Sequence, residues 1–306
     1  MNGQVRTILD MLARWAPKKE EAIPNDTLWL SEFRYQTDLL RHLSGWPEPG
    51  VEISHRLCGS VVVRLYRPSE GRLPLLLHMH GGGGVAGSVA GHDVPLRALA
   101  KATGCLVAAP LYRLAPEHRF PAQLDDGWEA LRYLVMDSGA LGVDRHRIVI
   151  SGDSIGATLA TTLARWTSHR DGPRIAGQIL LYPNTDLRAE ADYSSRRSED
   201  GNIISADDLA RQIDLYLVTP RQREHPDASP ILADDLRGAP PALIVTCGAD
   251  PLRDEGEAYA RRLIDAGVAV RHHRYDGMIH AFMQMGGCFD ATANLFEQIA
   301  QWLRQS

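Results

Sequence analysis

Short apolar runs alternate with helical stretches from residue 74 to the end of the chain, and this alternation constrains the fold most. The predicted strands are Pro74–His80, Cys105–Pro110, Arg147–Asp153, Gly177–Tyr182, Pro241–Gly248 and Val268–Tyr275. The predicted helices include Asp126–Val135, Gly156–Trp166, Glu255–Ala266 and Asp290–Leu303. Strands that are apolar on both faces belong to a sheet covered by helices on both sides. The pattern therefore predicts mostly parallel strands joined by right-handed crossovers.

Two more strands are predicted upstream of this region. Val51–Arg56 and Ser60–Arg67 are rich in valine and separated by a short turn, so we expect them to be antiparallel. With the six later runs they make an α/β fold of about eight strands flanked by helices. We assign residues 47–306 to this one α/β domain.

Two segments outside this rhythm are expected to form a helical cap. Residues 1–46 are predicted to be helical. A polar insertion at about 184–230 contains a predicted helix from Ala206 to Leu217, which Ser205 caps. Ligands bind at the carboxyl edge of open parallel sheets, so we expect both segments to cover that edge.

The composition narrows the range of partners. Hydrophobic residues make up 44% and charged residues 23% of the 306 residues, as in soluble proteins with a sizeable core. The net charge of −5 and the lack of a basic run argue against nucleic acid. No run reaches transmembrane length. Met1–Trp15 lacks the apolar core of a signal peptide. The apolar residues of this segment are spaced as on one face of a helix. Such a helix could lie on a membrane surface, but the small number of basic residues favours a helix that packs on its own protein.

The four cysteines are scattered and contain no C-x-x-C pair. Nothing demands a disulfide, so a cytoplasmic location is expected. Cys105 and Cys247 lie inside apolar runs and are predicted to be buried, unreactive thiols.

The segment Gly152–Gly156 reads G-D-S-I-G and contains the candidate nucleophile, Ser154. It follows a predicted strand and opens a predicted helix, which is the context of a G-x-S-x-G nucleophile elbow. The alternative is a turn whose serine merely caps the helix. The strand-then-helix setting favours the elbow, with the Ser154 hydroxyl near the positive end of the helix dipole.

A serine nucleophile needs a base, and in this type of fold the acid and the histidine follow it in the chain. Asp250 and His280 each come just after a predicted strand, so both lie on the same sheet edge as Ser154. His280 would take the Ser154 proton, and Asp250 would orient the imidazole and stabilise its cation. Three rival acids, interpreted as solvated charges or helix caps, are Asp254, Glu255 and Asp276.

A glycine loop, His80–Gly84, follows the strand that begins at Pro74. Acyl transfer requires donors for a tetrahedral oxyanion, and bare backbone N–H groups on glycines can approach one closely. We predict an oxyanion hole made by the N–H groups of Gly82, Gly83 and Ile155.

The same loop also fits a dinucleotide fingerprint through Gly82, Gly84 and Gly87. No Asp or Glu ends the following strand and no Lys follows the glycines, so nucleotide binding is disfavoured. His78 and His80 share a strand face without a third ligand nearby. We therefore expect no metal and no organic cofactor, and interpret His80 as support for the loop.

Several motifs in order carry a resemblance to a known family. They are His80–Gly83, Tyr112–His118, Phe120–Ala122 with Asp125 and Asp126, Gly152–Ser154, Asp250–Asp254 and Ile279–Phe282. The chain resembles the hormone-sensitive-lipase-like group of α/β hydrolases, the bacterial family IV esterases, from about Leu73 to Phe282.

The resemblance implies the same triad and oxyanion hole, an N-terminal helical cap and activity on short acyl esters. It also implies that Tyr112 to Asp126 brace the active-site loops, and that a homodimer forms through the sheet edge at the last strand. Four positions depart from the family pattern. Gly84 replaces an aromatic, Ile155 an alanine, and Ala157 and Ala281 glycines. We expect the first two changes to reshape the acyl side of the pocket.

The sequence therefore predicts a serine carboxylesterase that hydrolyses short- to medium-chain esters, including lactones, through an acyl-serine. An amidase or deacetylase would use the same triad. A non-catalytic binding protein on a hydrolase scaffold is the third hypothesis, disfavoured because all three triad members are present.

Overall fold

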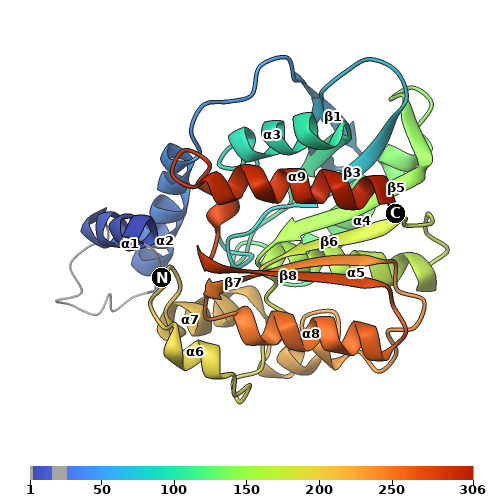
Figure 1. The fold of residues 1–306 in the computed structure, drawn as a ribbon. Coiled ribbons are helices and arrows are strands. Elements are labelled where there is room, and N and C mark those ends of the chain that lie inside the picture. Colours follow the sequence, from blue (N-terminus) through green and yellow to red (C-terminus); the bar gives the residue numbers. More distant parts are fainter. Residues whose placement is uncertain (1–2, 16–25, 306) are drawn as a thin grey trace.

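The structure, a computed structural model, describes residues 3–15 and 26–305. An eight-stranded sheet forms its centre (Figure 1). Its strands lie in the order β1-β2-β4-β3-β5-β6-β7-β8. Their bounds are β1 Glu52–Cys58, β2 Val61–Arg67, β3 Leu73–Met79, β4 Leu106–Pro110, β5 Val143–Asp153, β6 Gly177–Leu181, β7 Ala242–Ala249 and β8 Val270–Ile279. β2 pairs antiparallel with both β1 and β4, and the other pairs are parallel. The predicted eight-stranded, mostly parallel α/β fold is confirmed.

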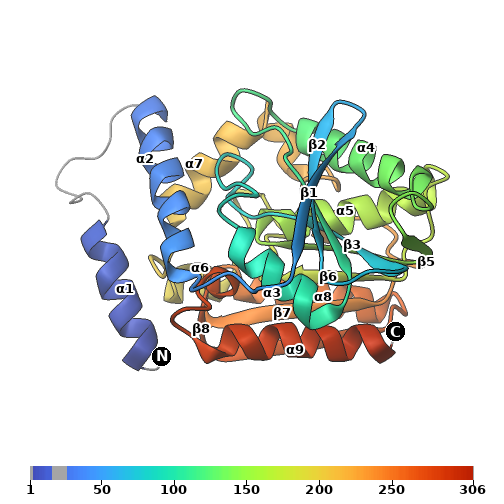
Figure 2. The same cartoon turned by 90° about the horizontal axis from the view of Figure 1, so that it is seen from above.

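Helices cover both faces of this sheet (Figures 1 and 2). On one face lie α3 (Asp93–Thr103) and α9 (Asp290–Gln305), and on the other lie α4 (Ala122–Met136), α5 (Ile155–His169) and α8 (Arg253–Asp265). Helix α3 was not among the predicted helices.

Alternation along the strands builds the two halves of the core. Leu75 and Leu77 of β3 pack into the half that contains α4 and α5, whereas Leu76 points into the half that contains α3 and α9. All three are fully buried. Because successive strand side chains point to opposite faces, a strand covered on both sides must be apolar throughout. This explains the unbroken apolar runs of the sequence.

The N-terminal segment forms two helices, α1 (Gly3–Trp15) and α2 (Asp26–Leu39). Val5 is fully buried, and Ile8, Leu9 and Leu12 pack against the same half of the core. Helix α1 thus packs on its own protein, as the sequence favoured.

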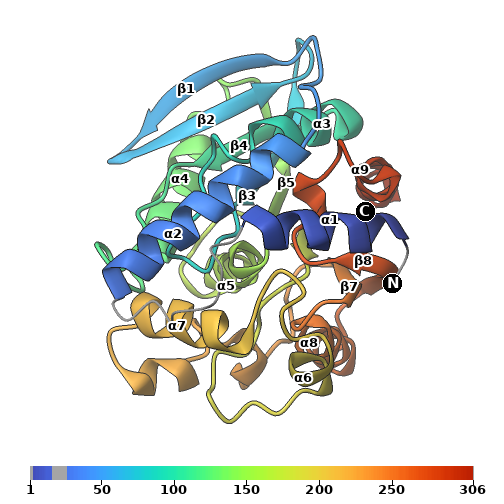
Figure 3. The ribbon, with the colours of Figure 1, turned by 90° about the vertical axis from the view of Figure 1, so that its left-hand side faces the viewer.

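The insertion after β6 contributes α6 (Ser194–Ser198) and α7 (Ala206–Tyr216). The Ser205 hydroxyl accepts a hydrogen bond from the Asp208 N–H, which confirms the predicted cap of α7. Figure 3 shows α1, α2 and α7 together on one side of the molecule, and residues of these helices line the same cleft as Ser154, which follows β5. This side is therefore the carboxyl edge of the parallel strands.

Candidate active site

Ser154 sits in the sharp turn between β5 and α5. Its φ of 56° lies in the left-handed region, a strained conformation for a residue with a side chain. A Cβ at Gly156 would lie 2.1 Å from the Met79 carbonyl oxygen, and one at Gly152 would lie 2.1 Å from the Gly156 carbonyl oxygen. The two glycines are therefore steric requirements of this turn, and the arrangement matches a nucleophile elbow.

His280 and Asp250 are joined by a hydrogen bond of 2.8 Å between Nδ1 and Oδ2. Asp250 is fully buried, and its Oδ1 accepts from the Leu252 N–H at 2.8 Å. The Tyr182 ring meets the imidazole edge-on, with ring centroids 4.8 Å apart. His280 and Ser154 line the same cleft. The structure thus brings the three predicted triad residues to one place and orients the histidine from two sides.

The rival acids have other partners. Asp254 accepts from the Ser195 N–H at 2.9 Å, and Asp276 pairs with Arg274 on the surface. The interpretation as solvated charges or caps was wrong for Glu255, which is fully buried and ion-paired with Arg196 at 2.6 Å. Nothing local in the sequence indicated this pair, because its partners are 59 residues apart.

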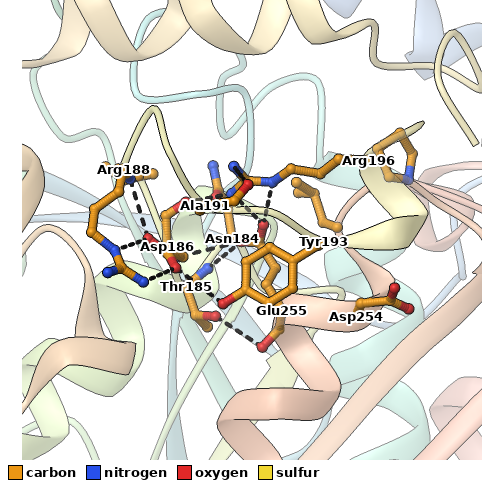
Figure 4. Close-up of polar contacts among 12 residues, drawn as sticks. Asn184, Thr185, Asp186, Arg188, Ala191, Tyr193, Arg196, Asp254 and Glu255 are labelled. Carbon is orange, nitrogen blue, oxygen red and sulfur yellow. Dashed lines mark hydrogen bonds and ion pairs between the residues drawn. The ribbon is translucent and has the colours of Figure 1, made fainter.

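Glu255 belongs to a polar cluster at the base of the insertion (Figure 4). Its Oε1 accepts from the Thr185 N–H at 2.7 Å, and Arg196 donates to its Oε2. Burial raises the pKa of Glu255 to about 7, although the charge of Arg196 acts against this rise. Asp186 is likewise fully buried and pairs with Arg188 at 2.8 Å. The cluster ties the start of the insertion to the first turn of α8.

The glycine loop is held from two sides. The Gly81 N–H donates to Asp153 Oδ1 at 2.9 Å, and the Tyr112 hydroxyl donates to the His80 carbonyl at 2.7 Å. Tyr112 also stacks on the His80 ring at a centroid distance of 4.2 Å. His80 therefore supports the loop, as the sequence indicated.

Two of the three residues predicted to supply oxyanion donors border the same space. Gly82 and Gly83 line the cleft beside Ser154, whereas Ile155, the first residue of α5, directly follows Ser154 but is not among the lining residues. The N–H groups of Gly82, Gly83 and Ile155 donate to no acceptor in the described part of the chain. A Cβ at Gly82 would lie 2.2 Å from the Ala86 carbonyl oxygen, so the tight loop needs glycine there.

A buried charge cluster behind the nucleophile escaped the sequence analysis. Asp153 is 1% exposed, and its Oδ1 lies 3.3 Å from His78 Nε2 and 3.4 Å from His92 Nε2. Burial by itself would raise the pKa of Asp153, but the charge of His92 and the hydrogen bonds of both histidines hold it well below its usual value. Asp153 in turn raises the pKa of His92 against the effect of burial.

This cluster had a signal in the sequence. Asp153 is a charged residue at the end of an otherwise apolar strand, and such a residue needs partners inside the protein. The partners of Asp153 are His78 on β3 and His92 at the start of α3. The residues around Asp153 in the sequence therefore could not predict which side chains it contacts.

Two departures from the family pattern have structural explanations. A Cβ at Gly84 would lie 2.5 Å from Cδ2 of Tyr216, so a ring from α7 occupies the space beside this position. Ile155 is 1% exposed in the core and is absent from the cleft lining. The structure thus differs from the expectation that Ile155 reshapes the pocket.

The other two departures are Ala157, which is fully buried in the core, and Ala281. Ala281 adopts a φ of 61°, a conformation that favours glycine and here directly follows His280. The segment from Tyr112 to Asp126 braces the glycine loop, since the Ala115 N–H donates to the Gly84 carbonyl at 2.9 Å, and Arg113 pairs with Asp126 at 2.6 Å within the segment.

The cleft that contains Ser154 has a volume of about 1190 Å³. Residues of α1, α2 and α7 supply much of its lining, together with Gly82 and Gly83 of the glycine loop. Among the described residues, no three His, Cys, Asp or Glu side chains are grouped to hold a metal ion.

Comparison with known proteins places this site in a family. Residues 76–284 match the family described as having the alpha/beta hydrolase fold. The chain belongs to this family. The resemblance to its hormone-sensitive-lipase-like group is confirmed, and the family region spans the elbow, the glycine loop, Asp250 and His280.

Individual relatives cover most of this α/β hydrolase. Ethyl acetate hydrolase of Pseudomonas putida is 39% identical over 250 residues, which are 79% of this chain and 78% of that protein. Carboxylesterase NlhH of Mycobacterium tuberculosis is 35% identical over 268 residues, 83% of each chain. The solved structure of a hyperthermophilic esterase from Pyrobaculum calidifontis has a TM-score of 0.90 and 34% identity, covering 100% of this chain and 98% of that one.

Two further expectations can be compared with the structure. No helix among residues 3–15 and 26–305 is long and apolar enough to cross a membrane. Cys105 and Cys247 are buried and unpaired, as predicted, and burial raises the pKa of both thiols.

Proposed function

We propose that this protein is a serine carboxylesterase that hydrolyses short- to medium-chain acyl esters through an acyl-enzyme on Ser154. The observation that carries the proposal is the 2.8 Å bond between His280 and Asp250 in the cleft that also exposes the strained Ser154. The named activities of ethyl acetate hydrolase and carboxylesterase NlhH support an ester substrate.

The proposed mechanism uses these residues in sequence. His280 Nε2 accepts the Ser154 hydroxyl proton while Oγ attacks the ester carbonyl carbon. The N–H groups of Gly82, Gly83 and Ile155 stabilise the oxyanion. Collapse expels the alcohol, which takes the proton from His280. Water then attacks the acyl-serine with His280 again as base, and the carboxylate product leaves with Ser154 restored. Asp250 stabilises the imidazolium in both halves.

Hydrolysis of p-nitrophenyl esters from acetate to dodecanoate tests the proposal, with wild type and Ser154→Ala side by side. We expect short and medium chains to be hydrolysed and the variant to lose roughly 10⁶-fold in kcat, as when other serine triads lose their nucleophile. Labelling of Ser154 by a fluorophosphonate provides an independent readout. Wild type that turns over no chain length, or a variant with undiminished activity, would contradict the proposal.

We also propose that residues 1–46 and 184–230 act as the cap of the catalytic domain, 47–306. Lining of the cleft by α1, α2 and α7 supports this division.

We further propose that the protein forms a homodimer through β8. This strand lies at the edge of the sheet, and its residues 271–274 are exposed. Sedimentation analysis would test it. The unpaired cysteines support the proposed cytoplasmic location.

A further inference from the structure

The side chain of Gln212, on α7, is a polar group without a partner at the wall of the active-site cleft. Gln212 is 5% exposed and lines the cleft that contains Ser154. No residue within 3–15 or 26–305 forms a hydrogen bond with its carboxamide. Among the described residues, the fully enclosed side-chain atoms without a hydrogen-bond partner belong to Gln123, Gln178, Tyr182 and Asn184, so the Gln212 amide keeps access to the cleft. A group that enters the cleft can supply what the fold does not.

The carboxamide lies against the glycine loop. A Cβ at Gly83 would be only 2.2 Å from Gln212 Oε1 and 2.8 Å from its Cδ, so the amide occupies the space directly beside this glycine. Rotation about the Cγ–Cδ bond, a broad torsion, exchanges Oε1 and Nε2 in this position. An N–H donor can therefore stand next to the predicted oxyanion hole.

Helix α7 is held firmly enough to place this group. One turn after Gln212, the ring of Tyr216 packs beside Gly84. The backbone carbonyl of Tyr216 accepts a hydrogen bond from the Phe120 N–H at 2.9 Å. One turn earlier, Asp208 accepts from the indole N–H of Trp29 on α2 at 3.1 Å. The contacts on both sides of Gln212 limit the movement of its backbone.

We propose that Gln212 donates a side-chain hydrogen bond to the carbonyl oxygen of the bound ester, which makes it a further catalytic residue. This inference rests on the proposed esterase function. An ester offers only acceptor oxygens, so the N–H group of the amide is the end that binds it. The bond strengthens as negative charge develops on that oxygen, and its effect therefore falls on kcat.

Gln212→Met tests the proposal, because methionine keeps the length of the side chain and removes the donor. We expect kcat to fall roughly 10²-fold, the effect of removing one oxyanion donor, with KM nearly unchanged. The inhibition constant of a boronic acid that mimics the tetrahedral intermediate should rise in parallel. Gln212→Glu, which keeps the shape but adds negative charge, should lose more activity.

Gln222→Met is the matched control in the same insertion. Its side-chain Oε1 accepts from the Val218 and Thr219 N–H groups, so its loss loosens the insertion without touching the cleft. We expect near wild-type kcat and a lower melting temperature. If Gln212→Met folds and keeps wild-type kcat and boronate inhibition, or changes KM alone, the inference is overturned. If Gln212→Met does not fold, the folded Gln212→Glu variant decides by the same two readouts.

Failure of this inference is separable from failure of the esterase proposal. Ester hydrolysis that requires Ser154 but is indifferent to Gln212 would refute only the role of Gln212. Wild type without any esterase activity would refute the proposal on which that role rests.

Discussion

The buried carboxylate of Asp153 is paired with His92, and this pair makes the stability of the protein depend on pH. The lowered pKa of Asp153 means that its stabilising contribution is present above its ordinary value, about 3.9, and is lost as the pH falls through the folded value. The raised pKa of His92 means that its contribution is complete below about 6.5 and is lost as the pH rises through the folded value. Both contributions are therefore present at pH 5.

We predict that Asp153→Asn lowers the free energy of unfolding by about 3–5 kcal/mol at pH 5, since it removes one partner of a buried ion pair. The loss should become smaller as the pH rises through the folded-state pKa of His92, because the wild type itself then loses the ion pair. Urea unfolding in steps from pH 5 upward measures this change. Asp265→Asn, at an exposed position on α8, should have little effect at any of these pH values. A loss from Asp153→Asn that grows as the pH rises would show that the pair does not titrate as described.

Helix α7 packs against the glycine loop through Tyr216, whose ring lies beside Gly84. Gly84 has a φ of +73°, and the Tyr216 ring stands where its side chain would go. The ring is 1% exposed and makes an edge contact with Phe120 at a centroid distance of 5.8 Å. An aromatic residue from a distant element thus fills the space beside the position at which the family carries one in the loop.

Restoring an aromatic in the loop should therefore be harmful on its own. We predict that Gly84→Phe destabilises the protein by about 3 kcal/mol, since a left-handed backbone costs about 1–2 kcal/mol and overpacking about 1–3 kcal/mol. Gly104→Phe is the matched control, with a φ of +69° and no atom within 4 Å of its Cβ. Gly104→Phe should lower the free energy of unfolding only by the cost of the left-handed backbone, about 1–2 kcal/mol.

A double-mutant cycle with Tyr216→Ala separates the two costs. The double variant Gly84→Phe/Tyr216→Ala should be more stable than the sum of the single losses implies, by at least about 1 kcal/mol. Thermal and urea unfolding measure all three variants. Additive losses, or equal destabilisation by Gly84→Phe and Gly104→Phe, would show that Tyr216 does not occupy the aromatic's space.

The molecule as a whole presents an acidic entrance to substrates. Among the described residues, five carboxylates on α1, α2 and α7 line the cleft, against one arginine, Arg211, and one of the five, Asp214, is ion-paired with Arg223. They are Asp10, Glu32, Asp207, Asp208 and Asp214. A cleft lined by one sign of charge raises the local concentration of oppositely charged substrates and repels like charges.

We predict that a cationic ester is hydrolysed with higher kcat/KM than its neutral isostere, on the order of tenfold at low ionic strength. Acetylcholine and 3,3-dimethylbutyl acetate form such a pair, and a hemisuccinate ester supplies the anionic comparison. The advantage should shrink toward unity in 0.5 M salt, where the Debye length is roughly 4 Å. Preference for the anionic ester would rule out this reading of the entrance.

The sequence by itself determined the class of fold and the positions of the candidate chemistry. Apolar runs of strand length separated by helical stretches specify a covered parallel sheet, because each run must bury both faces. Ser154, Asp250 and His280 each follow a strand directly, so their shared edge follows from chain order alone. These features depend on residues close together in the chain, which is why local patterns reveal them.

Only the tertiary structure decided which distant side chains meet. Asp153 with His92, Glu255 with Arg196, Gly84 with Tyr216 and Gly83 with Gln212 are contacts between different elements, and no local spacing encodes them. Each depends on how the insertion, the loops and α3 pack once the sheet has formed. The physical reason is that burial changes what a polar side chain needs: Glu255, which a sequence pattern treats as an ordinary surface charge, requires a partner when no water can reach it.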